Sequence, residues 1–457
     1  DNVKQIKQNT LMPRLLKFNP FDTAKVFRNV SSLKLVAVSS LFKLCSYDSV
    51  VSLATNMILK SRLAQYVVGK TVFLQFCPGT TLNSVKAEAY GLNSNHLIRS
   101  IPDKSVEETI SPEGREKNLQ NKKYMIEATS SAINAQSDVV KFTPIKISSM
   151  VCPESMETFS TAWNAFASGS ADYRVIEANL RLQYPELMTS FDERIQKIQG
   201  LCKIAKSNNM SILIDAEEST RQPAIDYIAR QLSKHMNRFG EVPTVYNTYQ
   251  MYLLRSPEVV RQEINHAENE GYIFAAKIVR GAYRISEGKR EIEKGTKILQ
   301  PSKQATDEVF DETINTILHH IASTTSSSSG TAFTSKAAVM IATHNTESVV
   351  KAVRTMERLG ISPDHEGVHI AQLKGMADHL TVSLGDSGYN AHKLFAYGEF
   401  KDVMPFLIRR MEENKDVFGA LHLDRELINQ ELTRRLNQWT KRQRLIPNTS
   451  SDHIKIA

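Results

Sequence analysis

Two adjacent arginines, Arg409 and Arg410, stand midway along a predicted helix, and Glu413 follows four residues after the first of them. The helix is predicted because apolar residues recur every three or four positions, at Phe400, Val403, Leu407 and Met411. Such arginines can belong to a solvated surface face. They can also hold a carboxylate between two guanidinium groups, with the glutamate orienting them. The segment alone leaves both interpretations open.

A second set of chemically active residues follows short apolar runs. Asp215 and Glu217 come directly after Ile212-Leu213-Ile214, and strand periodicity puts both carboxylates on one side. They could equally be the N-cap and first-turn acid of the next helix. Lys146 interrupts an apolar strand, so an inward Lys146 would need Asp215 or a ligand as its partner. An outward Lys146 would be an ordinary surface residue.

The run Thr343-His344-Asn345 offers a hydroxyl, an imidazole and an amide at the end of another predicted strand. It is a poor metal site, because no matching carboxylate or second histidine lies nearby in the sequence. The segment from His365 to His369 matches the zinc-protease pattern His-Glu-x-x-His, which requires a helix. Pro363, the internal Gly367 and a following strand argue against a helix, and on a strand the two histidines would stand about 13 Å apart. We therefore expect no metal.

The elements that must position these residues alternate between short strands and longer helices from about residue 140 onward. The predicted strands are 142–148, 212–217, 243–250, 274–281, 339–345, 368–372 and 393–397. Strands that alternate with helices form parallel βαβ units, and seven or eight units predict a distorted (βα)8 TIM-type barrel. Chemistry in such barrels lies at the carboxyl ends of the strands, where the polar clusters occur.

Composition narrows the class of protein. The 457 residues are 41% hydrophobic, which indicates a globular chain. The sequence contains no run of about 18 consecutive apolar residues, so no membrane span is predicted. The four cysteines are widely spaced and form no Cys-x-x-Cys, so neither a disulfide framework nor a zinc site is indicated. No Gly-x-Gly-x-x-Gly or phosphate loop is present, so a nucleotide cofactor would not be held by a Rossmann turn.

The net charge of +8 is concentrated at the N-terminus. Residues 1–46 hold eight Lys and Arg but only two Asp, a pattern typical of a mitochondrial transit segment, although a basic surface helix remains an alternative. The predicted organisation is a transit segment over 1–24, an N-terminal helical region over 25–135, a barrel over 136–420 and a C-terminal helix and tail over 421–457. Residues 323–335 are Ser-rich and predict a surface loop.

Taken together, these segments resemble the proline dehydrogenase family in its mitochondrial form. The matching pieces occur in order over about residues 30–435: Lys146 in its strand, Asp215-Ala-Glu217, Tyr249-Gln250-Met-Tyr-Leu, Lys277-Ile-Val-Arg-Gly-Ala-Tyr283, Ala342-Thr-His-Asn345, Gln372-Leu-Lys-Gly-Met376, and Arg409-Arg410 with Glu413-Asn414. Each motif is weak by itself, and seven in the right order are specific.

The resemblance implies an FAD-dependent oxidation of L-proline to 1-pyrroline-5-carboxylate, with a hydride passing to flavin N5 and electrons then passing to a quinone. Arg409 and Arg410 would hold the substrate carboxylate, Glu413 would orient them, and Lys146 and Asp215 would form a polar floor. The residues implied to contact FAD are Gln250, Lys277, Val279, Ala282, Thr343, His344, Asn345 and Gln372. The implied location is the matrix side of the inner mitochondrial membrane, at its surface.

The chain departs from the family pattern at Leu394, where members that prefer proline carry a tyrosine. Hydroxyproline dehydrogenases also lack this tyrosine, so a hydroxyproline-oxidising relative is the alternative. Ala396 stands where proline is usual, and Lys374 where an apolar residue is usual. A non-enzymatic basic mitochondrial binding protein is a remote alternative. Because the charge is confined to the N-terminus, we expect no nucleic-acid partner.

Overall fold

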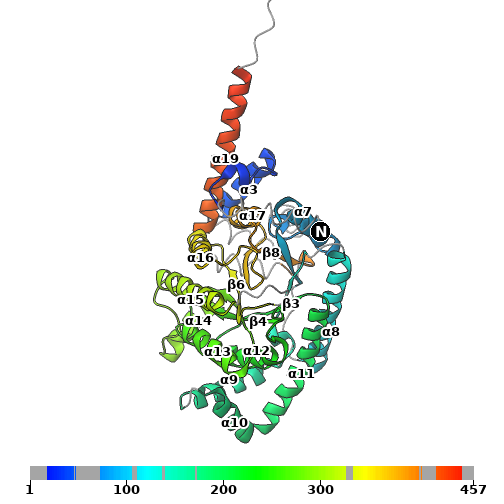
Figure 1. The fold of residues 1–457 in the computed structure, drawn as a ribbon, viewed down its shortest axis with the longest axis vertical. Coiled ribbons are helices and arrows are strands. Elements are labelled where there is room, and N and C mark those ends of the chain that lie inside the picture. Colours follow the sequence, from blue (N-terminus) through cyan, green and yellow to red (C-terminus); the bar gives the residue numbers. More distant parts are fainter. Residues whose placement is uncertain are drawn as a thin grey trace, which may run out of the picture.

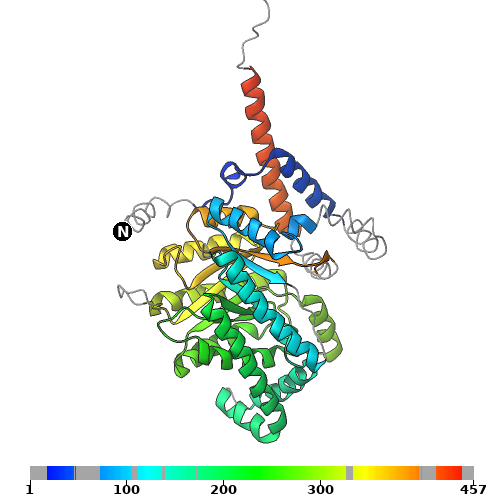
Figure 2. The same ribbon diagram turned by 90° about the vertical axis from the view of Figure 1, so that its right-hand side faces the viewer.

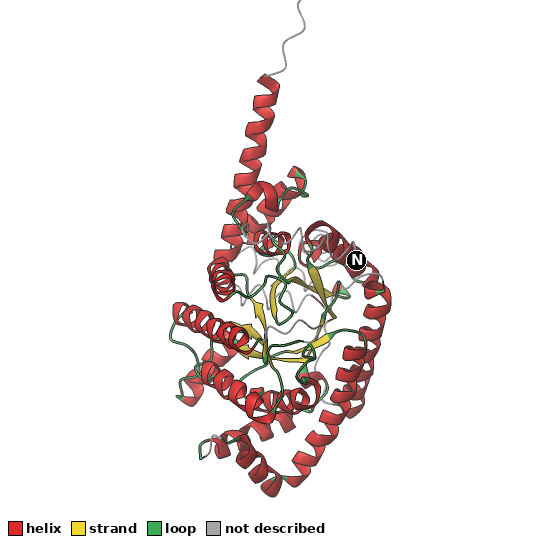
Figure 3. Ribbon diagram, in the orientation of Figure 1, coloured by secondary structure: helices red, strands yellow, loops and turns green. Residues whose placement is uncertain are grey.

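In the computed structural model, eight parallel strands alternate with helices and nearly close into a barrel (Figures 1 and 3). The structure describes residues 18–45, 47, 73–104, 111–135, 139–169, 172–325, 333–400, 403 and 418–444. The strands are β1 (Arg99–Lys104), β2 (Phe142–Ile145), β3 (Ser211–Ile214), β4 (Val245–Gln250), β5 (Phe274–Val279), β6 (Ala337–Ala342), β7 (Val368–Leu373) and β8 (Ala391–Tyr397). Their order is β1-β8-β7-β6-β5-β4-β3-β2, and a single bridge between Ser100 and Val140 links the two edge strands. The predicted barrel is therefore confirmed.

The barrel begins earlier than the sequence predicts. The region 25–135 was expected to be helical, yet it contains β1, which pairs with β8 from Arg99 opposite His392 to Lys104 opposite Tyr397. The strand Arg-Ser-Ile-Pro-Asp-Lys has little β propensity, and its proline argues against a central strand. Pro102 is tolerated because β1 is an edge strand, joined to β2 only by the Ser100–Val140 bridge.

Helices surround the strands and connect them. The described α-helices are α2 (Thr23–Val26), α3 (Ser32–Cys45), α6 (Leu74–Phe76), α7 (Leu82–His96), α8 (Pro112–Thr129), α9 (Pro153–Ala167), α10 (Tyr173–Gln183), α11 (Pro185–Ser207), α12 (Gln222–Met236), α13 (Ser256–Glu270), α14 (Arg284–Lys294), α15 (Lys303–Thr324), α16 (Thr346–Leu359), α17 (Asp378–Asp386) and α19 (Phe418–Arg444). A π-helical turn, η2 (Ser130–Asn134), continues α8, and a 3-10 turn, η3 (Ile147–Ser149), follows β2.

The inside of the barrel is filled by one side chain or more from every strand. The buried members are Ile101, Phe142, Leu213, Tyr246, Ala275, Ala338, Met340 and Ala371, and Leu394 packs against them. Because side chains alternate across a strand, Asp103, Asp215 and Lys277 lie two positions beyond Ile101, Leu213 and Ala275 on the same inward side. The apolar side chains inside the barrel therefore give way to a layer of charged side chains at the carboxyl ends of the strands. We call this end of the barrel its mouth.

Outside the barrel, α3 packs against α19, and α19 then extends away from the rest of the molecule (Figures 1 and 2). Their shared core contains Leu35 and Phe42 of α3 with Leu427 and Ile428 of α19. The beginning of α19 is fastened near the barrel, since Asp424 accepts a hydrogen bond of 2.8 Å from the backbone N–H of Ala377.

None of the helices in the described part of the chain is long and apolar enough to cross a membrane. Several predicted features lie outside the described residues: most of the transit segment, most of the helix over 400–414, and most of the loop over 323–335.

Candidate active site

The centre of the candidate site is an ion pair between Lys277 and Asp215. Lys277 lies near the end of β5 and Asp215 follows β3, and Lys277 Nζ donates to Asp215 Oδ1 at 2.6 Å. The lysine side chain is 11% exposed and the aspartate side chain 38% exposed. A half-open ion pair at the mouth of a parallel barrel places one positive and one negative group where a ligand can reach them.

An inward Lys146 was expected to need Asp215 or a ligand as its partner. In the structure Lys277 pairs with Asp215, and the expectation for Lys146 stays a prediction. Lys146 follows β2 in an extended conformation and is half-buried at the start of η3. It lies four positions beyond Phe142, whose side chain fills the barrel, so its backbone position is on the inward side.

Asp103 and Lys122 add two more charges to this mouth. Burial raises the pKa of Asp103 to about 6, and Asp215 adds to the rise while Lys122 and Lys277 oppose it. Burial also lowers the pKa of Lys122, which is only 6% exposed, against the pull of Asp103 and Asp215. The charges of Asp215 and Lys277 therefore lie close enough to act on Asp103, and that of Asp215 close enough to act on Lys122.

The loop that carries Asp215 is fixed from three sides. The Glu217 carboxylate accepts from the backbone N–H of Ser148, in η3, at 3.0 Å, and the Glu217 carbonyl accepts from Gln250 Nε2 at 2.8 Å. Ser219 donates its N–H and its hydroxyl to the two carboxylate oxygens of Glu287 in α14, each at 2.6 Å. Glu287 is fully buried and is also paired with Arg290. These contacts give Asp215 a defined position.

Among the predicted FAD contacts, Gln250 ends β4 and is hydrogen-bonded to the segment that follows β5. Its amide nitrogen donates to the Glu217 carbonyl, and its Oε1 accepts from the backbone N–H of Ala282 at 3.1 Å. Val279 ends β5, and its carbonyl accepts from the N–H of Met251 at 2.9 Å. The structure therefore brings Gln250, Lys277, Val279 and Ala282 together at one sector of the mouth.

The next sector holds the other four predicted contacts. Gln372 Nε2 donates to the Thr343 carbonyl at 3.1 Å, and His344 Nε2 accepts from the N–H of Leu373 at 3.0 Å. Asn345 caps α16 by accepting from the N–H of Ser348 at 3.0 Å. Gln372 and His344 thus join the segments that follow β6 and end β7 through bonds to backbone groups.

Arg280 connects the two sectors, and the sequence argument did not single it out. Its guanidinium donates to Asp307 at 2.5 Å, to Thr343 Oγ1 at 2.6 Å and to Ser348 Oγ at 2.9 Å. It also lies over the ring of Phe310, 4.3 Å from the centroid. Its place in the Lys-Ile-Val-Arg-Gly segment, three residues after Lys277, was the available signal. Lys122 was also missed, although a lysine between Leu119 and Ile126 on the buried face of α8 marks it as unusual.

Leu394 lies on β8 opposite Ile101 of β1 and packs against the side chains that fill the barrel. It therefore faces inward, below the charged layer. Arg409, Arg410 and Glu413 lie outside the described residues, so their predicted placement over the mouth stays a prediction.

The rejected zinc motif does not form a helix. His369 is in β7 and Val368 begins that strand, while His365 precedes it in a turn. His369 Nδ1 lies 3.1 Å from His392 Nε2, and its Nε2 donates to the Glu366 carbonyl at 3.0 Å. Among the residues that the structure describes, no group of three His, Cys, Asp or Glu side chains is placed to hold a metal ion.

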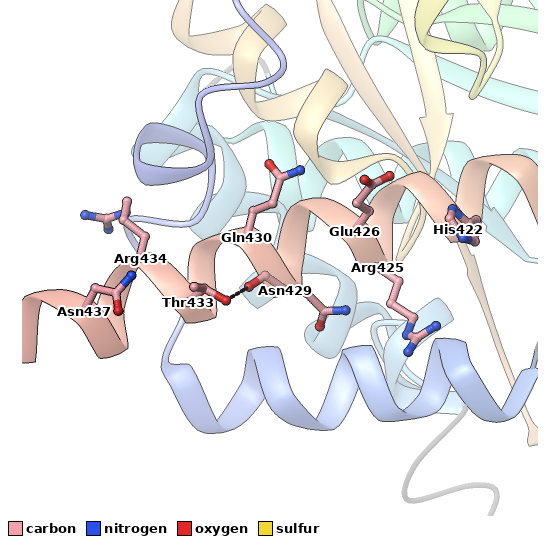
Figure 4. Close-up of a pocket in the computed structure, with 8 residues that line it drawn as sticks. All are labelled: His422, Arg425, Glu426, Asn429, Gln430, Thr433, Arg434 and Asn437. Atoms are coloured by element: carbon pink, nitrogen blue, oxygen red, sulfur yellow. Dashed lines mark hydrogen bonds between the residues drawn. The ribbon is translucent and has the colours of Figure 1, made fainter.

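A polar groove of about 700 Å³ runs along α19, away from the ring of strand ends (Figure 4). It is lined by His422, Arg425, Glu426, Asn429, Gln430, Thr433, Arg434 and Asn437. All of these residues belong to one helix, so the groove is a surface feature of α19 and contains none of the residues at the barrel mouth.

Comparisons with known proteins identify the family of this chain. Residues 85–422 match the family model described as proline dehydrogenase. The chain is 34% identical to human proline dehydrogenase 1, mitochondrial, over 53% of this chain and 38% of that protein. It is 27% identical to hydroxyproline dehydrogenase of Xenopus laevis over 91% of this chain and 90% of that protein. The match thus spans well under half of the human relative.

A similar fold occurs in a solved structure of proline utilization A (PutA) from Bdellovibrio bacteriovorus inactivated by N-propargylglycine. That structure has a TM-score of 0.61 and 16% identity, covering 77% of this chain and 34% of the other. The match to the family model covers most of the chain, including every described strand of the barrel. The chain belongs to the proline dehydrogenase family.

Proposed function

We propose that this chain oxidises L-proline to 1-pyrroline-5-carboxylate at the barrel mouth, with FAD as its resident cofactor and a quinone as the final electron acceptor. The observation that carries the proposal is the Lys277–Asp215 pair at the carboxyl ends of β5 and β3, within a chain of this family. Proline carries a carboxylate and an amine on neighbouring atoms, and a site for it needs both charges close together.

The residues at the mouth fit FAD by their chemistry. Lys277 supplies a cation, and Thr343 precedes α16, whose N-terminal end favours negative groups such as a diphosphate. Gln250 and Gln372 add amide groups suited to the polar edge of a flavin. The residues that would hold the cofactor are Gln250, Lys277, Val279, Ala282, Thr343, His344, Asn345 and Gln372. When bound, FAD supplies the hydride acceptor that the side chains lack.

The protein would contribute binding and orientation. Arg409 and Arg410 would clamp the substrate carboxylate, Glu413 would hold their guanidinium groups in place, and Asp215 would accept a hydrogen bond from the substrate amine. Lys277 keeps the Asp215 carboxylate in position, and Lys146 completes the polar floor. Orientation of the ring beside the cofactor is then set by residues from four separate segments.

A hydroxyproline dehydrogenase is the second candidate. Leu394 packs into the barrel in place of a larger tyrosine, and the frog relative that aligns over 91% of this chain is named hydroxyproline dehydrogenase. An apolar pocket discriminates against an added hydroxyl by only about 100-fold. We propose proline as the better substrate and hydroxyproline as a slower one.

We also propose a mitochondrial location at the matrix face of the inner membrane, where a quinone is available. The support is the basic first 46 residues and the word mitochondrial in the names of several relatives.

Steady-state kinetics of the purified, FAD-supplemented protein test the substrate assignment. L-proline and 4-hydroxyproline are offered separately with a soluble dye acceptor, and the products are identified by mass spectrometry. The proposal expects oxidation of both, with a higher kcat/KM for proline. Oxidation of neither substrate would reject the proposed reaction, and a higher kcat/KM for hydroxyproline would favour the second candidate.

A further inference from the structure

The tip of the molecule formed by α3 and the end of α19 combines exposed apolar side chains with basic residues. We define the α3–α19 tip as residues 32–45 and 432–444. These two stretches contain seven Lys and Arg and no Asp or Glu. We propose that the α3–α19 tip is a docking surface for an anionic lipid bilayer; this deepens the proposed function, because it names the part of the chain that would meet the membrane.

The first observation is an exposed apolar stripe on α3. Leu35, Ser39 and Phe42 face α19 and are buried. On the other side, Leu33, Val36 and Leu44 are 84%, 50% and 54% exposed, and their spacing of three and eight residues puts them on one face. A soluble surface helix normally shows polar residues on the face that is turned away from its core.

The second observation is the free end of α19. Ser39 Oγ donates to Asn429 Oδ1 at 2.8 Å, and Arg435 donates to the carbonyls of Val30 and Phe27 at 2.7 Å each. Beyond Arg435 every residue to Lys441 is exposed, and the helix projects from the molecule (Figures 1 and 2).

This projecting end is amphipathic. Leu436 and Trp439 are 60% and 59% exposed and lie three residues apart, so they share a face. Arg435 reaches Ser32 Oγ at 3.2 Å, which brings the start of the α3 stripe beside the base of this face. The polar groove on α19 extends to Asn437 and so overlaps the base of this projecting end (Figure 4).

Charge decides the partner. Within the described part of α19, the acid nearest to this end is Glu431, which is fully buried and is already paired with both Arg434 and Arg435. An acid-free surface with a tryptophan, leucines and basic residues matches the interface of an anionic bilayer, where apolar groups enter the headgroup boundary and cations contact the lipid phosphates. A neutral or basic protein surface would leave this positive charge without a complement.

Vesicle co-sedimentation tests the proposal with the full-length protein. Phosphatidylcholine vesicles with and without anionic phosphatidylglycerol are incubated with the wild type, with Leu436→Glu/Trp439→Glu, and with the matched control Leu182→Glu/Ile292→Glu. The control residues are 80% and 84% exposed on α10 and α14, so the same charge is added away from the α3–α19 tip. We expect the wild type and the control to bind the anionic vesicles, and the tip variant to bind at least about tenfold more weakly.

Tryptophan emission gives an independent readout, because the chain has two tryptophans and Trp163 is buried. Anionic vesicles should shift the emission of Trp439 to shorter wavelength, and Trp439→Phe should remove the shift. Equal binding of tip variant and control, or no binding by the wild type, would overturn the proposal. If the wild type dimerises but does not bind vesicles, and the tip variant is a monomer, the surface would instead bind a second copy of the chain.

Dye-coupled proline oxidation in the same preparations separates this proposal from the proposed function. The tip variant should keep wild-type activity with the soluble acceptor while losing vesicle binding. Vesicle binding without any proline oxidation would reject the enzyme assignment and leave the docking surface standing.

Discussion

At the scale of single residues, Lys277 has the most consequential contact at the mouth of the barrel. Its ammonium group is nearly buried and bonded to Asp215, while Asp103 and Lys122 lie within electrostatic reach. The sequence pointed to Lys277 and Asp215 as separate residues, on separate strands. Their pairing could not be read from the sequence, because it depends on β3 and β5 both ending at the same edge with one strand between them.

Replacing Lys277 by Met should lower kcat/KM for proline by about 10- to 100-fold, because one charge-assisted hydrogen bond contributes roughly 1.5–3 kcal/mol. The same change at Lys289, which is exposed on α14, should leave the kinetics unchanged. Steady-state assays on both variants, at matched FAD content, check this. Equal activity of the two variants would remove Lys277 from the proposed site.

Leu394→Tyr should raise the ratio of kcat/KM for proline over hydroxyproline. The leucine side chain lies inside the barrel, so a larger ring there would crowd a substrate hydroxyl. The two kinetic constants are measured on the variant and on the wild type. A ratio that stays flat or falls would show that Leu394 does not border the substrate ring.

At the scale of elements, the position of Asp215 depends on α14, which is distant in sequence. Glu287 of α14 is fully buried and receives two hydrogen bonds from Ser219. Glu287→Ala should destabilise the fold by about 2–4 kcal/mol, because Ser219 loses its acceptor and Arg290 loses one of its two carboxylate partners, keeping only Glu218. It should also lower proline turnover, since the Asp215 loop loses one of its three attachments.

Urea unfolding and kinetics of Glu287→Ala check both effects, with Glu293→Gln on the exposed face of α14 as the control. Glu287→Gln keeps a side-chain oxygen and adds an amide nitrogen at the places of the two carboxylate oxygens, so it can still bond to Ser219. Its proline turnover should therefore be higher than that of Glu287→Ala. Full activity in Glu287→Ala would show that α14 does not position the loop.

Seven of the eight strands follow from the sequence, because β2 to β8 are apolar runs that end in polar residues. The first strand, β1, does not, since its Arg, Pro, Asp and Lys resemble a loop and only its pairing with β8 makes it a strand. The helix α3 lies within the region predicted to be helical, but the docking of α3 on α19 was not foreseeable. That contact joins residues almost 400 positions apart, such as Ser39 and Asn429, and local periodicity carries no information about it.

At the scale of the whole molecule, the barrel buries two histidines away from the carboxyl ends of its strands. His369 and His392 are buried there, 3.1 Å apart, among Phe142 and Tyr246. Burial lowers the pKa of His369 to about 3 and that of His392 well below its usual value, and the charges of Arg99 and Lys141 add to both shifts.

Acid should therefore destabilise the fold. Between the folded pKa of about 3 and the unfolded pKa of about 6.5, the unfolded chain binds more protons at His369, so stability falls as the pH falls through this window. His369 alone should cost about 1.4 kcal/mol at pH 5.5 relative to neutral pH. Urea unfolding at both pH values should show a smaller difference for His369→Gln than for the wild type. The exposed His235→Gln serves as the control, and an undiminished pH dependence in His369→Gln would contradict the assignment.

The measurement that tests the central claim most directly is anaerobic addition of L-proline to the purified, FAD-loaded protein while the flavin absorption band is recorded. Without oxygen or a quinone, electrons taken from proline have nowhere else to go. The account predicts that the band is bleached by L-proline and that bleaching slows strongly in Lys277→Met. A flavin-loaded wild-type protein whose band does not change on addition of proline would contradict it.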